Sequence, residues 1–186
     1  MKKSIFTVLL GASLIALITG CSQQKEEVAA SDINVGIILG FTGPIESLTP
    51  TMASSAEMAF KEATDAGVLN GSTLNPVRAD STCIDAAAAT SAAERLVTAD
   101  NVAAIMGADC SGVTTAIANN VAVPNGVTII SPSATSPALT TIEDKGFFFR
   151  TAPSDARQGQ VLAQVVMDRG IKKLAVTYTN NDYGKG

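Results

Sequence analysis

The sequence contains no histidine and no tryptophan, and only 4% of its 186 residues are aromatic. Without histidine, the chain lacks the side chain that most often acts as a general base or as a metal ligand. A hydrolase with Ser111 or Ser131 as its nucleophile would have no histidine to activate the serine, and no Gly-x-Ser-x-Gly elbow is present. We therefore expect a binding protein without metal or cofactor, with a serine hydrolase as the weaker alternative.

Basic residues are also scarce, at 13 against 17 acidic residues. Two of the basic residues, Lys2 and Lys3, lie at the very start of the chain. The part after residue 20 therefore has a net charge of 11 minus 17, or −6. Because nucleic acid binding requires a basic stripe, nucleic acid is excluded as the expected partner.

The only long apolar run, Ile5 to Ile18, is too short to span a bilayer and follows a basic start. This arrangement is typical of a cleaved export signal, which we place at residues 1–20. The small residues before Cys21 resemble the lipobox of bacterial lipoproteins, which implies a lipid on this cysteine. An ordinary secretory signal with a coincidental cysteine is the alternative.

Residues 21–31 are polar, show no apolar periodicity and are expected to form a flexible tether. The protein is then predicted to be periplasmic or at the cell surface, anchored to the membrane by its N-terminal lipid. The remaining cysteines, Cys83 and Cys110, form an even pair in an exported chain, so we expect a disulfide between them. Two buried free thiols are the alternative.

From Asp32 onward, short apolar runs rich in β-branched residues alternate with longer stretches of helical periodicity. Strands are expected at Ile33–Leu39, Leu74–Ala79, Val102–Met106, Val127–Ile130 and Leu174–Tyr178, and Phe147–Arg150 is expected to be a short extended piece. Helices are expected at Thr51–Ala66, Asp85–Ala99, Ser111–Val121 and Asp155–Asp168. Strands that are apolar along their whole length are covered on both faces, which predicts an α/β fold with a doubly wound parallel sheet.

The inner faces of two helices are also predicted from three- and four-residue steps. For the first helix the expected face is Met52, Ala56, Ala59, Phe60 and Ala63. For the second helix, which Asp85 is expected to cap, it is Ala88, Ala92, Leu96 and Ala99.

Ligands of open parallel sheets bind beyond the carboxyl ends of the strands, so the loops that follow the strands are the candidate site. These loops are rich in hydroxyls, amides and glycine, and they contain Gly40-Phe41-Thr42-Gly43-Pro44, Asp80-Ser81-Thr82-Cys83, Gly107-Ala108-Asp109-Cys110-Ser111, Ser131-Pro132-Ser133-Ala134-Thr135-Ser136-Pro137 and Asn180-Asn181-Asp182-Tyr183-Gly184. Free N–H groups at a helix start suit a carboxylate. Asp80 and Asp109 have neither a partner base nor metal-ligand spacing and are interpreted as structural or solvated, and Arg150 is expected to pair locally.

These loops, together with Phe148-Phe149-Arg150-Thr151, resemble in content and order those of type I periplasmic binding proteins. The nearest resemblance is to the leucine/isoleucine/valine-binding proteins of branched-chain amino-acid ABC transporters. It covers Asp32 to Gly186 and implies a two-lobed clamp that binds a small amino acid or a related amide and delivers it to an ABC permease in the inner membrane. Lobe one would comprise 32–152 and be incomplete, and 153–186 would begin a truncated lobe two.

The resemblance also implies roles for individual residues. Ser111 would hold the ligand carboxylate, and Thr135 would contact both carboxylate and ammonium. Backbone groups of Ser133 and Ala134 would meet the ammonium, and Tyr183 would close over the ligand. Leu48 stands near the position where branched-chain binders carry an aromatic residue against the ligand side chain.

Two other functions remain open at the level of sequence. The same fold also serves as a ligand-sensing module that signals to a partner. A dinucleotide-binding protein ranks last, because Gly-x-Gly-x-x-Gly does not follow the first strand.

Overall fold

Strands and helices alternate along the chain in the computed structural model, which describes residues 30–186. The predicted export signal and Cys21 lie outside the described residues. The strands are β1 (Asp32–Leu39), β2 (Thr73–Asp80), β3 (Ala104–Gly107), β4 (Thr128–Ser131) and β5 (Phe148–Arg150). The helices are α1 (Thr49–Asp65), α2 (Ala86–Thr98), α3 (Ser111–Ile117), the π-helical turn η1 (Ala118–Ala122), the 3₁₀ turn η2 (Pro137–Thr140), α4 (Asp155–Asp168) and α5 (Asp182–Lys185).

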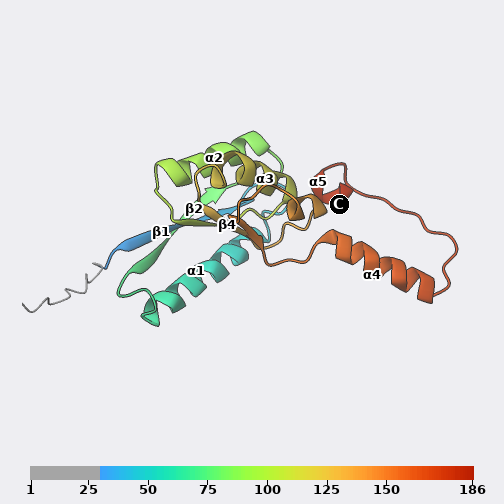
Figure 1. Cartoon of the computed structure of the whole chain (residues 1–186), viewed down its shortest axis with the longest axis horizontal. Coiled ribbons are helices and arrows are strands. Elements are labelled where there is room, and N and C mark those ends of the chain that lie inside the picture. The colour runs from blue at the N-terminus through green and yellow to red at the C-terminus, as the bar shows by residue number, and fades with distance from the viewer. Residues whose placement is uncertain (1–29) are drawn as a thin grey trace, which may run out of the picture.

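The five strands form one parallel sheet in the order β2-β1-β3-β4-β5. Helix α1 covers one face of this sheet, and α2 and α3 cover the other (Figure 1). The predicted doubly wound α/β architecture is therefore confirmed. Within residues 30–186, no helix combines the length and apolar character that a membrane span requires.

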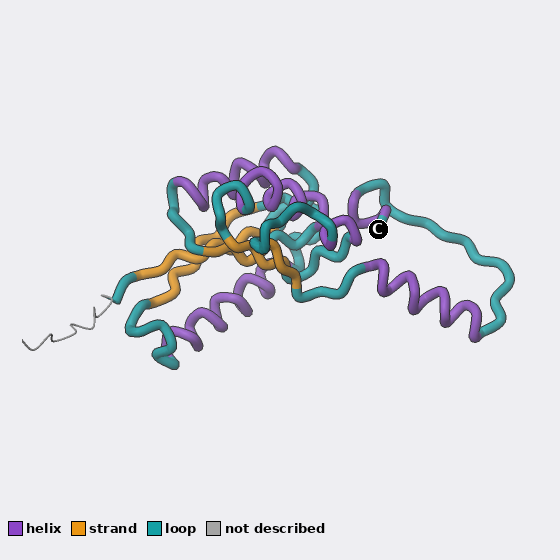
Figure 2. Tube along the Cα trace, viewed as in Figure 1, coloured by secondary structure: helices purple, strands orange, loops and turns teal. Residues whose placement is uncertain are grey.

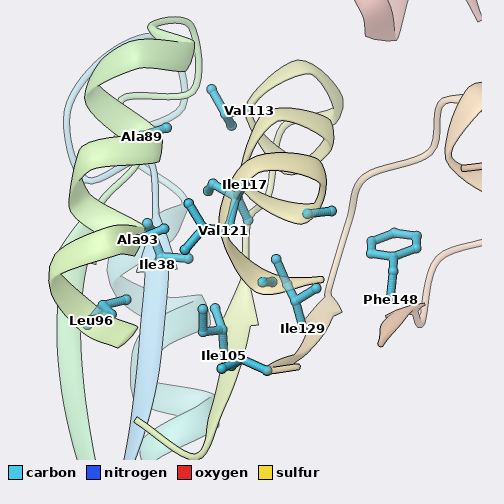
Figure 3. Packing of buried hydrophobic residues seen from close by; sticks show 14 of the residues in the cluster. Ile38, Ala89, Ala93, Leu96, Ile105, Val113, Ile117, Val121, Ile129 and Phe148 are labelled. Carbon is cyan, nitrogen blue, oxygen red and sulfur yellow. The ribbon is translucent and has the colours of Figure 1, made fainter. Parts of the chain in front are cut away.

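The two faces of β1 are buried in two different clusters, because successive side chains of a strand point to opposite sides. Ile38 packs with α2 and α3, whereas Ile37 and Leu39 pack with Ala53 of α1. Figure 3 shows the larger cluster, in which side chains of α2 point toward Ile38 and toward the side chains of α3. The core thus lies next to the loops at the carboxyl ends of the strands.

Helix α2 begins where the sequence predicts, since the Asp85 carboxylate accepts hydrogen bonds from the backbone N–H groups of Ala87 and Ala88. Its predicted inner face is wrong by one residue. Leu96 is buried and Ala92 packs against the core as expected, but the buried alanines are Ala89 and Ala93, and Ala88 and Ala99 are exposed. An alanine-rich helix offers two adjacent faces of equal apolarity, and only contact with the sheet selects one of them.

Two further differences concern single helices. In α1, Ala59 is exposed and Ala53 is buried, although Met52, Ala56 and Phe60 do face the sheet. The helix predicted at Ser111–Val121 is α-helical only to Ile117 and continues as the π-helical η1. Helix α4 has the predicted bounds, Asp155–Asp168.

The strand predicted at Leu174–Tyr178 does not form. The segment between α4 and α5 has no regular structure, and the side chains of Leu174, Val176 and Tyr178 are exposed. Figure 2 shows this segment as a long loop that runs outside the sheet. A strand is stable only with a hydrogen-bonded neighbour, and the described residues supply none here.

Candidate functional site

The sheet order places a switch in direction at β1, whose neighbours are β2 on one side and β3 on the other. In sheets of this kind, the ligand crevice lies outside the carboxyl ends of the strands at the switch point. The candidate site is therefore the set of loops that follow the first four strands. Their residues are 40–44, 81–85, 108–110 and 132–136.

One buried carboxylate, that of Asp109, joins three of these loops. Its Oδ2 accepts a hydrogen bond from the Gly40 N–H at 2.7 Å, and its Oδ1 accepts one from the Ser81 hydroxyl at 3.3 Å. Oδ1 also accepts from the Cys110 N–H at 2.9 Å. Asp109 is only 4% exposed, so these bonds are shielded from water. The interpretation of Asp109 as a structural residue agrees with this geometry.

A disulfide between Cys83 and Cys110 links the loop after β2 to the loop after β3. The two cysteines are 27 positions apart in the sequence, and their Cα atoms are 5.2 Å apart. Cys110 immediately precedes Ser111, the first residue of α3. The cross-link therefore restrains the backbone next to this predicted ligand residue.

Ser111, which is predicted to bind the carboxylate of the ligand, contacts the loop that contains most of the other predicted binding residues. Its side chain is 2% exposed, and its hydroxyl oxygen accepts a hydrogen bond from the Ser136 N–H at 3.2 Å. Ser136 directly follows Thr135. The structure thus brings the start of α3 and the loop after β4 together at one place.

The loop after β4 is held on both sides. On the side of the loop after β3, the Ser131 hydroxyl donates to the Ala108 carbonyl at 2.5 Å, and the Ser133 hydroxyl donates to the Asp109 carbonyl at 3.0 Å. On the side of β5, the Arg150 guanidinium donates to the Ser136 carbonyl at 2.8 Å and to the Ala134 carbonyl at 3.3 Å. Arg150 therefore pairs locally, as predicted, and fixes the path of this loop.

Thr135 is joined to the first residue of α4. Its hydroxyl donates to Asp155 Oδ2 at 2.7 Å, and the Asp155 N–H donates to the Thr135 carbonyl at 2.9 Å. Both residues line a cavity of about 330 Å³ between the loop after β4 and α4. The predicted ligand residue thus makes a two-point contact across the segment from Arg150 to Ser154.

Tyr183 lies on α5, next to this region, and is 57% exposed. It lines a second, wider groove of about 810 Å³, together with Asp155 of α4. Gly186 lies against the loop after β4 and the start of η2, since a Cβ placed on Gly186 would come within 3.4 Å of Ser136 Cα and 2.5 Å of Pro137 Cδ. Leu48 is 58% exposed at the N-terminal end of α1 and lines neither cavity.

A second aspartate, Asp80, ties the loop after β1 to the loop after β2. It accepts from the Thr42 hydroxyl at 2.6 Å and from the Thr82 N–H at 2.8 Å. Burial favours the neutral acid, but these hydrogen bonds, with those from the Thr42 and Phe41 N–H groups, outweigh burial and lower the pKa of Asp80. Asp80 is thus a structural residue, in line with its interpretation from the sequence.

Residues 30–186 contain no group of three or more cysteine, aspartate or glutamate side chains that is arranged to hold a metal ion. What the loops offer is a set of neutral hydroxyl and backbone groups with the Asp155 carboxylate at one end. Such a set suits a small polar ligand that carries both a carboxylate and an N–H donor.

A family model described as periplasmic binding protein matches residues 32–186 of the chain. The chain belongs to this family of periplasmic binding proteins. Its similarity to curated members of the family includes 34% identity over 189 residues to the Leu/Ile/Val-binding protein homolog 1 of Brucella melitensis. That alignment covers all of this chain and 47% of the relative, so the chain spans about half the length of the curated relatives it matches.

Solved structures of periplasmic binding proteins share the fold. The branched-chain amino acid transporter substrate-binding protein LivJ of Streptococcus pneumoniae, solved in complex with isoleucine, matches with a TM-score of 0.66 and 30% identity. The match covers 74% of this chain and 38% of that one. An ABC transporter substrate-binding protein of Desulfitobacterium hafniense, in complex with Leu, matches with a TM-score of 0.68 and 27% identity over 83% of this chain and 44% of that one.

The contact of Asp155 with Thr135 is not predicted from the sequence, where Asp155 is interpreted only as the start of a helix. Its partner Thr135 lies 20 positions away, and the hydrogen bond of Asp109 to Gly40 spans 69 positions. Apolar periodicity reports on burial and carries no information on such pairs. The one available signal was position, because both aspartates follow closely after a strand.

Proposed function

We propose that the protein carrying this chain is the extracytoplasmic solute-binding component of an ABC importer, and that it binds a small amino acid of the branched-chain type. The relatives named for binding leucine, isoleucine and valine support this proposal, as does the family membership. The proposal includes a lipid anchor at Cys21 and delivery of the ligand to a membrane permease.

The observation that carries the proposal is the contact between Ser111 and the loop after β4. A hydrogen bond from the Ser136 N–H to the Ser111 hydroxyl brings Ser111, which we propose to bind the ligand carboxylate, close to the loop that contains Thr135 and Ala134. An amino acid has its carboxylate and its ammonium on one carbon atom, so the groups that bind them must be close together. In our proposal Ser111 holds the carboxylate, and Thr135, with backbone groups of Ser133 and Ala134, holds the ammonium.

We propose different roles for Tyr183 and Leu48. Tyr183 lines the wider groove together with residues of α4, and we propose that it covers the ligand. Leu48 is exposed at the N-terminal end of α1, and we propose only that it is an apolar neighbour of the ligand side chain. Both residues are exposed, and their contact with the ligand is part of the proposal.

Binding, without turnover, is the expected activity. The chain has no histidine, and the Ser131 hydroxyl is committed to the Ala108 carbonyl. Neither Ser131 nor Ser111 has a base within hydrogen-bonding distance among the described residues. An importer component has no need of such a base, since its task is to capture and release.

Isothermal titration calorimetry of the longest product that the gene encodes, against a panel of the common L-amino acids, tests the proposal. Saturable binding of leucine, isoleucine or valine, with smaller neutral amino acids weaker, is the expected result. Absence of binding for every member of the panel, in a preparation whose fold is verified by circular dichroism, overturns the proposal.

A further inference from the structure

The chain contains two asparagine–glycine pairs, Asn70-Gly71 and Asn125-Gly126, and both asparagines are exposed. The first pair lies in the turn between α1 and β2, and the second lies in the turn between η1 and β4. An asparagine that precedes glycine is prone to lose its side-chain amide through attack by the glycine nitrogen, because glycine has no Cβ to hinder the approach. Since both pairs share this sequence and are exposed, their hydrogen bonds decide how they differ.

At Asn70-Gly71, neither reacting group is engaged. Among residues 30–186, no acceptor binds the Gly71 N–H, and no group is hydrogen-bonded to the Asn70 side chain. The backbone hydrogen bond that spans the pair runs from the Ser72 N–H to the Leu69 carbonyl at 3.0 Å. The Asn70 side chain and the Gly71 nitrogen can therefore turn toward each other without breaking a hydrogen bond of their own.

At Asn125-Gly126, both reacting groups are engaged. The side-chain N–H of Asn125 donates to the Val121 carbonyl at 2.8 Å. The Gly126 N–H donates to the Val123 carbonyl at 3.2 Å. Attack by the Gly126 nitrogen requires that both bonds break first, so the fold protects this pair.

We propose that Asn70 is a site of spontaneous deamidation in the folded protein, and that Asn125 is protected from the same reaction. The Gly71 nitrogen gives up its proton and forms a bond to Asn70 Cγ. The bond between Cγ and Nδ2 breaks, and Nδ2 leaves with that proton as ammonia, which closes a succinimide ring. Water then opens the ring at either of its carbonyls and leaves aspartate or isoaspartate at position 70. The amide and water are thus converted into an acid and ammonia, without an oxidant or a reductant.

The product changes the turn beside the start of the sheet. A Cβ placed on Gly71 would come within 3.4 Å of Ala30 Cβ, and the Ser72 hydroxyl accepts a hydrogen bond from the Ser31 N–H at 3.2 Å. The new acid is ionised at neutral pH, and isoaspartate also adds a carbon atom to the backbone. The reaction therefore adds a negative charge where the predicted tether joins the sheet, at the opposite end of the strands from the proposed ligand site (Figure 1).

Incubation of the longest gene product in mildly alkaline buffer, followed by peptide mapping with mass spectrometry, tests the proposal. Trypsin places the two asparagines in different peptides, since Arg78 and Arg95 lie between them. Deamidation raises the mass of a peptide by the difference between a hydroxyl and an amino group, and an isoaspartate methyltransferase labels the isoaspartate. We expect Asn70 to react roughly tenfold faster than Asn125 or more, because two hydrogen bonds must break before Asn125 reacts.

The same protein unfolded in denaturant is the control for the effect of sequence. Both asparagines then precede glycine in an unstructured chain, so their rates should become similar. Asn70→Gln, whose longer side chain disfavours ring closure, should abolish the reaction in its peptide, since the other asparagine there, Asn75, precedes a proline without an N–H. Asn125→Gln should leave the reaction at Asn70 unchanged.

Equal rates at the two asparagines of the folded protein, or a faster reaction at Asn125, overturn the proposal. Absence of reaction at Asn70 in the folded protein, over a time in which the unfolded protein reacts, also overturns it. A difference in rate that persists unchanged in denaturant refutes the role of the hydrogen bonds. None of these outcomes depends on whether the protein binds an amino acid.

Discussion

A single carboxylate, that of Asp109, holds the loops after β1, β2 and β3 in one arrangement, and it does so without an opposite charge nearby. Backbone N–H groups and one hydroxyl satisfy it instead. Such a buried and fully bonded group resists rearrangement, because breaking any of its bonds leaves a polar atom without a partner. The start of α3 with Ser111, which we propose to contact the ligand, thus directly follows a loop that is held in place before the ligand arrives.

The first prediction concerns Ser111. Replacement by alanine removes the hydroxyl that we propose to bind the ligand carboxylate, and should weaken leucine binding by roughly 1.5 to 3 kcal/mol, the usual range for a hydrogen bond to a charged group. Calorimetry measures the loss. Ser54→Ala on the exposed side of α1, where the hydroxyl donates only to its own helix, serves as the control and should bind normally. Unchanged affinity in Ser111→Ala would remove this residue from the site.

The second prediction uses the lowered pKa of Asp80. A carboxyl group whose pKa is lower in the folded state adds stability above its ordinary pKa of about 3.9, and this contribution is lost as the pH falls through the folded value. Asp80→Asn should therefore cost about 1 kcal/mol of unfolding free energy at pH 7 and less at pH 3.

Denaturant unfolding at the two pH values measures this difference. Thr42→Val, which keeps the carboxylate but removes one of its donors, should show a smaller version of the same behaviour. An Asp80→Asn deficit that is equal at pH 7 and pH 3 would contradict the assignment.

At the level of elements, the strands and helices around the core are those that the apolar pattern predicts. Ile38 and Leu96 belong to runs whose periodicity is clear, and both are fully buried. The predicted strand at Leu174–Tyr178 has an equally clear pattern, yet it has no neighbour to pair with among the described residues. Sequence pattern thus shows what a segment is suited to form, and the partner decides whether it does.

The candidate site was only partly predictable for a related reason. The loops that carry Ser111 and Thr135 could be located, because they follow strands of a parallel sheet. The side-chain pairs that orient them could not, since Asp109 and Asp155 bond to residues far away in the sequence. Such pairs depend on how loops meet in space, which local periodicity does not encode.

The disulfide that links the loops after β2 and β3 is expected to stabilise the fold. The bond between Cys83 and Cys110 joins residues that are 27 positions apart in the sequence. On the chain-entropy model, such a cross-link adds about 3.5 kcal/mol to the free energy of unfolding. The double variant Cys83→Ala, Cys110→Ala should lose stability of this order in denaturant unfolding.

Because Cys110 precedes Ser111, the same variant should also bind leucine more weakly. Reducing agent should destabilise the wild-type protein and leave the double variant unaffected. If reduction changes neither protein, the cross-link has no part in holding the site.

At the level of the whole molecule, the buried residues are concentrated in the sheet, the helices that cover it and the loops between them. Helix α4 has no buried residue, and the segment that follows it is exposed throughout. Both extend away from the sheet (Figure 1). We propose on this basis that residues 32–152 form one lobe and that residues 153–186 belong to a second. The hydrogen bonds between Thr135 and Asp155 would then lie at the junction of the two.

Limited proteolysis of the 186-residue chain checks this division. Within residues 30–186, trypsin is expected to cut first at Lys172 or Lys173, where the backbone has no regular structure and no side chain is buried. Mass spectrometry should then find a resistant fragment that includes all five strands. An initial cut between β1 and β5 would contradict the proposed lobe.

The central claim is that Ser111 and Thr135 bind the two charged ends of one amino acid. A crystal structure of the longest gene product with bound leucine tests it most directly. Our account predicts the ligand carboxylate within hydrogen-bonding distance of the Ser111 hydroxyl and the ammonium beside Thr135. A ligand bound elsewhere, with neither residue in contact with it, would contradict the account.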